Sequence, residues 1–199
     1  MLSKWTIYVL FESRRDRTDP NWVSFHLDGV IAVEEDHGDS VARVELELSA
    51  PSLYIRHLSN TPPILWCSQR KCADGAVLAE SDGGLVLHVV ELKSKLTLKE
   101  WRKVRQQFEG MIFNAISLSA VVEVARPSNV ICYISFNSNA IDGDASANPA
   151  LAKFAIGDRS AFSDLVEWKK GSIDIAGFTG IKLLKLQRDA STNSARAAL

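Results

Sequence analysis

The sequence has 199 residues, of which 46% are hydrophobic and 24% charged, and its formal net charge is −1 at pH 7. These are the values of an ordinary globular protein that can bury a core. A net charge near zero gives no information about binding partners, so any basic patch has to be local. Three cysteines argue against a disulfide framework, and no apolar run is long enough to cross a bilayer. We therefore expect a soluble cytoplasmic protein without membrane contacts.

The first fifty residues are rich in β-forming residues. Strands are predicted at 4–11 and 41–49, and one or two strands at 22–34, with a break near Asp28-Gly29. Residues 1–50 are therefore expected to form a β-rich N-terminal portion, either within the main domain or as a subdomain.

The segment 49–63, "SAPSLYIRHLSNTPP", is ambiguous. Ser49 could cap a short helix with Pro51 in its first turn, and Pro62-Pro63 would then end that helix.

The segment 74–95 is predicted to form a β-hairpin that is apolar on both faces. Asp82-Gly83 indicates a two-residue turn, because both central positions of a type I′ turn need positive φ. That turn pairs Ser81 with Gly84 and, further out, Asp74 with Glu91. A turn at Gly83-Gly84 would instead pair Asp74 with Lys93.

Residues 97–122 form the clearest predicted helix, with Thr97 and Glu100 in a capping-box pattern. Apolar residues recur along it at steps of three and four, which gives one apolar face. These residues are Leu98, Trp101, Val104, Phe108, Met111, Ile112, Ala115, Leu118 and Val122.

The remaining third of the chain is predicted to alternate between strands and helices. Residues 129–139 form an apolar central strand, 148–170 hold one or two helices that end at Gly171, and 173–187 form a strand pair. The tail 189–199 lacks a packing pattern and is predicted to be disordered.

The hairpin collects charge at its open end. Side chains alternate along a strand, so Asp74, Glu91 and Lys93 point to the same side. Two carboxylates at the end of a buried hairpin need a proton, a partner or a metal ion, and oxygen ligands of this type suit Mg²⁺ or Mn²⁺. An ordinary salt-bridged strand end would show the same residues.

An Asp at the start of one strand, followed by Glu-x-Lys at the end of the next, resembles the motif of the PD-(D/E)XK nuclease superfamily. The matching residues are Asp74 and Glu91-Leu92-Lys93, and the strand–strand–helix–strand order of 73–137 is similar to that superfamily's core. The position before Asp74 is Ala73 rather than proline, and no acidic helix precedes the hairpin, so the chain resembles a divergent member.

The resemblance implies hydrolysis of phosphodiester bonds. Asp74, Glu91 and the carbonyl of Leu92 would hold Mg²⁺ or Mn²⁺, and Lys93 would orient or deprotonate the attacking water or stabilise charge at the phosphate. Many members carry a glutamine in the following helix. Gln107 is preferred over Gln106, because it lies at the border of the apolar face.

A local basic cluster follows the motif. Phosphate contacts are expected from five residues, opposed within this segment only by Glu100. They are Lys95, Lys99, Arg102, Lys103 and Arg105.

The sequence therefore predicts an α/β (α+β) fold with a central mixed sheet flanked by helices. A restriction-endonuclease-like core is expected over 51–188, between the N-terminal portion and the tail. The expected function is that of a metal-dependent nuclease that cleaves DNA in preference to RNA. We expect it to act in defence, restriction or repair, as a homodimer or as a subunit of a larger complex. The alternative is a non-catalytic interaction or assembly subunit that keeps the fold.

Overall fold

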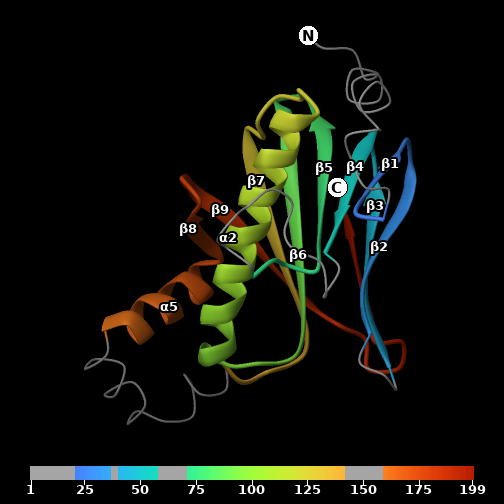
Figure 1. Ribbon diagram of the computed structural model, residues 1–199. Helices are drawn as coiled ribbons and strands as arrows, with labels where there is room; N and C mark the ends of the chain where they lie inside the picture. Colours follow the sequence, from blue (N-terminus) through green and yellow to red (C-terminus); the bar gives the residue numbers. More distant parts are fainter. Residues whose placement is uncertain (1–20, 37–39, 58–70, 142–158) are drawn as a thin grey trace.

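The computed structural model describes residues 21–36, 40–57, 71–141 and 159–199, and it has an α+β architecture (Figure 1). The strand predicted at 4–11, the first part of the helical segment predicted at 148–170, and Pro62-Pro63 lie outside the described residues. None of the helices in these ranges is long and apolar enough to span a membrane.

A mixed sheet of seven strands forms the centre, in the order β1-β4-β5-β6-β7-β9-β8. β7 lies parallel to both β6 and β9, whereas the other neighbours are antiparallel. The strands are β1 (Val23–His26), β4 (Ser52–Arg56), β5 (Gly75–Ser81), β6 (Gly84–Leu96), β7 (Asn129–Asn139), β8 (Ser172–Ile175) and β9 (Phe178–Gln187).

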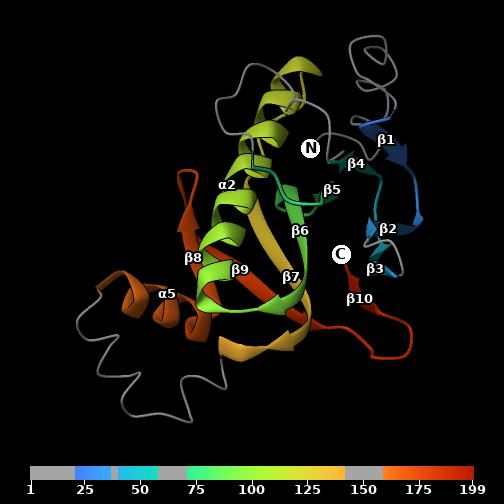
Figure 2. The ribbon, with the colours of Figure 1, turned by 60° about the horizontal axis from the view of Figure 1, so that its bottom comes forward.

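Helices cover one face of this sheet and a second sheet covers the other (Figure 2). The helices are α2 (Leu98–Val121) and α5 (Arg159–Lys170), and the second sheet consists of β10 (Ser194–Ala198), β3 (Val41–Leu48) and β2 (Gly29–Asp36). Apolar residues fill both interfaces, so β5 and β6 are buried on both sides, as the sequence predicts.

Local signals in the sequence account for α2. Thr97 is its N-cap, and its hydroxyl accepts a hydrogen bond from the Glu100 amide at 3.2 Å. The predicted apolar face is confirmed: it is buried against the sheet, with Leu98 partly buried at its edge.

The register predicted for the hairpin is confirmed, but its turn type is not. Ser81 pairs with Gly84, and the ladder continues to Gly75 opposite Val90. Neither Asp82 nor Gly83 has positive φ; instead Gly84 does, at 117°. A turn followed by a left-handed glycine sets the same register as a type I′ turn.

The helix considered for 49–63 is wrong where the structure describes that segment. Ser52–Arg56 form β4, whose Leu53 and Ile55 enter the core on the helical side, while Tyr54 enters the core below the second sheet. Pairing with β1 and β5 on both sides outweighs the local capping signal of Ser49 and Pro51.

The expectation of a disordered tail is also wrong. β10 pairs in parallel with β3, and the amide of Leu199 bonds to the carbonyl of Glu47 at 3.0 Å. A turn at 189–193 prepares this pairing. The Asp189 carboxylate accepts bonds from the Ser191 hydroxyl and the amides of Ser191 and Thr192, which lowers the pKa of Asp189 to about 2.

The predicted boundary at residue 50 also differs from the division between the sheets. β1 belongs to the seven-stranded sheet, whereas β2 and β3 form the second sheet together with the C-terminal strand.

His88 is a buried, hydrogen-bonded core residue, as its place in the hairpin indicates. Its Nδ1 lies 2.9 Å from the Tyr133 hydroxyl, and burial lowers the pKa of His88 to about 4. In the unfolded chain a histidine titrates near its ordinary pKa of about 6.5.

We predict that His88 makes the protein less stable in acid. Between pH values of about 6.5 and 4, the unfolded chain binds a proton at His88 that the folded protein does not bind. The free energy of unfolding therefore falls by up to about 1.4 kcal/mol for each unit by which the pH is lowered. Urea denaturation across this range measures the slope, and His88→Gln should reduce it. His26→Gln serves as a control because His26 is less buried; an equal effect of both substitutions would contradict the prediction.

Candidate functional site

The open end of the β5–β6 hairpin brings Asp74, Glu91 and Lys93 together. The ladder ends with Gly75 opposite Val90, and Asp74 follows directly outside β5, close enough to Glu91 for their charges to interact. Asp74 is half-buried and its Oδ2 accepts a hydrogen bond from the Leu92 amide at 2.7 Å. The predicted convergence of these residues therefore exists in the fold, because the turn register determines it.

Glu91 is the most constrained member of the cluster. Its side chain is 0% exposed, its Oε1 pairs with the Lys93 ammonium, and its Oε2 has no hydrogen-bond partner within the described part of the chain. Burial raises the pKa of Glu91 well above its ordinary value, and Asp74 raises it further, while Lys93 opposes both effects. A buried carboxylate oxygen without a partner is costly unless a proton or a cation compensates it.

Lys93 is held as a cation between acidic groups. Burial alone would lower the pKa of Lys93, but its ion pair with Glu91 outweighs burial, and Asp74 and Glu35 add to the effect, so the pKa is raised. Lys93 is therefore protonated at neutral pH. The acids that raise the pKa of Lys93 are therefore Glu91, Asp74 and Glu35.

The second sheet contributes an acid that sequence reasoning missed. Glu35 follows Ile31 and Val33 in the alternation of β2, on the face that packs against the large sheet. Its charge raises the pKa of both Glu91 and Lys93. The signal in the sequence that could have identified Glu35 is this alternation, because it places the Glu35 carboxylate on the same face of the strand as two buried apolar residues.

Arg188 is the second residue that sequence reasoning missed. It lies just beyond β9 and is 4% exposed, and its guanidinium donates to the carbonyl of Lys93 at 2.9 Å. Burial lowers the pKa of Arg188, whereas Glu35 and Asp74 act to raise it. Sequence reasoning placed Arg188 at the end of the core but gave it no role, because its partners lie on strands far from it in the sequence.

Gln107 lies beside the segment that leads into Asp74. Its backbone carbonyl accepts a bond from the Ala73 amide at 3.1 Å, and its side-chain Nε2 lies 3.5 Å from the carbonyl of Cys72. Gln106 is exposed and instead accepts a bond from Lys71 at 2.5 Å. Both glutamines therefore contact the segment 71–73 that leads into Asp74, and the role of Gln107 stays a prediction.

The basic cluster is less free than its sequence suggests. Arg102 and Arg105 donate to the buried Asp164 of α5 at 2.5 and 3.4 Å, and Lys103 pairs with Glu100 at 2.7 Å. Lys95 and Lys99 are exposed. The carboxylates of α5 could not be placed next to α2 from sequence, because that contact joins segments about sixty residues apart.

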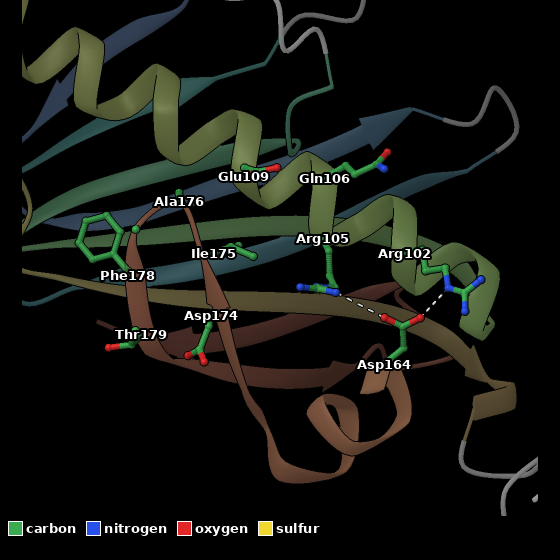
Figure 3. A pocket seen from close by; sticks show the side chains of 11 residues that line it. Arg102, Arg105, Gln106, Glu109, Asp164, Asp174, Ile175, Ala176, Phe178 and Thr179 are labelled. Carbon is green, nitrogen blue, oxygen red and sulfur yellow. Dashed lines mark hydrogen bonds and ion pairs between the residues drawn. The ribbon is translucent and has the colours of Figure 1, made fainter. Parts of the chain in front are cut away.

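A pocket of about 830 Å³ lies on another side of α2 (Figure 3). Arg102, Arg105 and Asp164 line it together with the β8–β9 turn, including Phe178. None of Asp74, Glu91 and Lys93 lines this pocket, so it is separate from the charged cluster.

The donor chemistry of the cluster fits a hard cation with few protein ligands. Two carboxylates and the Leu92 carbonyl supply oxygen, which Mg²⁺ accepts while keeping several waters. Within the described ranges, however, no three Asp, Glu, His or Cys side chains gather closely enough to bind a metal by themselves. Only Asp74 and Glu91, with the backbone carbonyl, are therefore available as expected ligands.

Comparison of the chain with models of protein families, with curated proteins and with solved structures finds no match. The assignment of function therefore depends on the geometry of the site.

We predict strong energetic coupling between Glu91 and Lys93. Lys93→Met leaves the Glu91 carboxyl buried beside Asp74 without its cation and should destabilise the fold, whereas the same change in a Glu91→Gln background should cost less. A double-mutant cycle measured by urea denaturation without divalent ions should give a coupling energy of roughly 1–3 kcal/mol. A cycle that closes to zero would show that the pair does not form in solution.

Proposed function

We propose that the protein is a metal-dependent phosphodiesterase of the PD-(D/E)XK type that cleaves nucleic acid, with DNA favoured over RNA. The observation that carries this proposal is the buried Glu91 close to Asp74, with one carboxylate oxygen left without a partner among the described residues and Lys93 alongside. Buried groups with strongly shifted pKa values gather at functional sites more often than elsewhere.

In this proposal Asp74, Glu91 and the carbonyl of Leu92 hold Mg²⁺ or Mn²⁺. A bound divalent ion supplies a water of lowered pKa and offsets charge on the phosphate. Leu92 suits its role because its amide already bonds to Asp74, and the amide and carbonyl of one strand residue point to the same edge. The carbonyl of Leu92 therefore faces the side on which Asp74 lies.

The raised pKa of Lys93 favours one of its possible roles. An ammonium that keeps its proton at neutral pH cannot deprotonate water, but it can orient the water or bind a phosphate oxygen. We therefore assign Lys93 to orientation and charge stabilisation. Gln107 has a supporting role, because it contacts the residues that position Asp74.

Nucleic acid would approach along the exposed lysines that follow the motif. Lys95 and Lys99 lie beyond the end of the hairpin and at the start of α2, next to the proposed site. The contribution of the other three basic residues, Arg102, Lys103 and Arg105, to phosphate binding would be reduced, because carboxylate partners already offset part of their positive charge.

The setting we propose is anti-phage defence, restriction or repair in the cytoplasm. In this proposal the protein acts as a homodimer or within a larger complex that selects the target. These statements depend on analogy with the superfamily that the motif resembles.

A second candidate is a non-catalytic interaction or assembly subunit. The ion pairs favour it: Lys93 pairs with Glu91, and Arg102 and Arg105 pair with Asp164 and Glu167, as in a structural network. Strongly shifted pKa values also occur in such networks.

We predict that the wild-type chain cleaves DNA only with Mg²⁺ or Mn²⁺, and that Asp74→Asn, Glu91→Gln and Lys93→Ala each lower the rate by at least about a hundredfold. Plasmid, linear and single-stranded DNA, with RNA in parallel, serve as substrates.

Lys182→Ala provides the matched control, because Lys182 is an exposed lysine on β9. The control variant should keep full activity. Activity that persists unchanged in Lys93→Ala would exclude the proposed site, and a wild-type protein that cleaves none of the substrates would favour the assembly role.

We also predict different contributions from the basic residues. Lys95→Ala and Lys99→Ala should each weaken binding to DNA of any sequence and reduce the slope of log K against log salt concentration by about 1. Arg102→Ala should affect stability more than binding, because its partner Asp164 is buried. Fluorescence anisotropy across salt concentrations measures the slopes. A larger slope change in Arg102→Ala than in Lys99→Ala would reverse this assignment.

A further inference from the structure

Arg188 links three neighbouring strands at the carboxyl end of β6. From the end of β9 its side chain reaches across β7, where Nη1 donates to the carbonyl of Ser135 at 3.2 Å. Nη2 continues to the carbonyl of Lys93 on β6 at 2.9 Å. A planar guanidinium can make these bonds together because its donors are fixed in a fork.

The remaining donor of Arg188 connects this fork to the C-terminal turn. Nε donates to the side-chain oxygens of Asn137 at 2.8 Å and Asn193 at 3.0 Å. Asn193 in turn bonds to the second sheet: its Nδ2 donates to the carbonyl of Val41 at 3.0 Å, and its carbonyl accepts from the amide of Arg43 at 3.1 Å.

The other edge of the same stretch of β6 is held by Asp74, which accepts the Leu92 amide. β5 ends its ladder at Gly75, so within the described ranges the Glu91–Lys93 segment has no regular strand neighbour on that side. The Glu91–Lys93 segment is therefore held by its pairing with β7 and, in addition, by side-chain hydrogen bonds from Asp74 and Arg188. Burying an arginine is costly, and the four residues that accept its bonds offset that cost.

We propose that Arg188 is the positioning residue of the site: by holding the Lys93 carbonyl, it sets the direction in which Lys93 projects and links the site to the C-terminal strand. This inference depends on the proposed function for its effect on catalysis. Arg188 itself does not act on the substrate. It maintains the geometry of a group that does, and a displacement of about 1 Å can cost on the order of a hundredfold in rate.

The test uses the full chain with Arg188→Met and Arg188→Lys, and Arg196→Met as the control. Arg196 belongs to the same C-terminal segment but is exposed and pairs only with Glu45 among the described residues. We expect both Arg188 variants to lower kcat on the DNA substrate about a hundredfold with KM within about twofold, because a lysine cannot reproduce the fork. Unchanged kcat in Arg188→Met, with an active wild type, would overturn the inference.

Amide NMR separates this inference from the proposed function. In Arg188→Met the amide resonances of Leu92 and Ser94, which flank Lys93, should shift. The Leu92 amide should also exchange with solvent at least about tenfold faster, whereas amides at the centre of β7 should keep their protection from exchange. If the wild type cleaves nothing, local changes of this kind still support the positioning role, and unchanged Leu92 and Ser94 amides overturn it.

Asn193→Gly provides a milder variant if Arg188→Met fails to fold. Asn193 has a φ of 50°, which glycine adopts without strain, so the change removes one acceptor of Arg188 and leaves the backbone intact. We expect a several-fold loss of kcat and the same two amides to shift. A variant with wild-type kcat and unchanged amides would count against the inference.

Discussion

The site depends on the burial of Glu91. A carboxyl group without solvent exposure has to be compensated, and Lys93 compensates only one of its oxygens while Asp74 and Glu35 add negative charge. The hairpin brings Asp74 close to Glu91 just beyond the end of its ladder, and apolar residues cover both faces of β5 and β6. The open oxygen of Glu91 beside the Asp74 carboxyl group is therefore the place where a proton or a divalent cation would compensate for burial, and this need for compensation is the physical basis of the proposed activity.

The second sheet takes part in this arrangement as well as in the core. It places Glu35 towards the cluster, and it is joined to the site through Asn193 and Arg188. The C-terminal strand completes that sheet by pairing with β3, so a segment without an obvious packing pattern holds the environment of Lys93 in place. Helices α2 and α5 support the opposite face, where Asp164 holds Arg102 and Arg105.

Local patterns predicted much of the fold. Alternation and the turn signal predicted the hairpin and its register, and three- and four-residue spacing predicted the buried face of α2. Contacts between distant segments could not be predicted: β4 is a strand because β1 and β5 flank it, and β10 forms because β3 offers an edge. For the same reason the sequence indicated Asp74, Glu91 and Lys93, which one hairpin carries, but not Glu35 or Arg188.

The central claim is that Asp74 and Glu91 share a divalent cation beside Lys93. The most direct measurement is a crystal structure of the wild-type protein soaked in Mn²⁺, with anomalous scattering used to locate the ion. The account predicts a peak bonded by oxygens of both carboxylates at a little over 2 Å, with water completing the coordination. Crystals saturated with Mn²⁺ that show no peak between Asp74 and Glu91, with Lys93 still paired to Glu91, would contradict it.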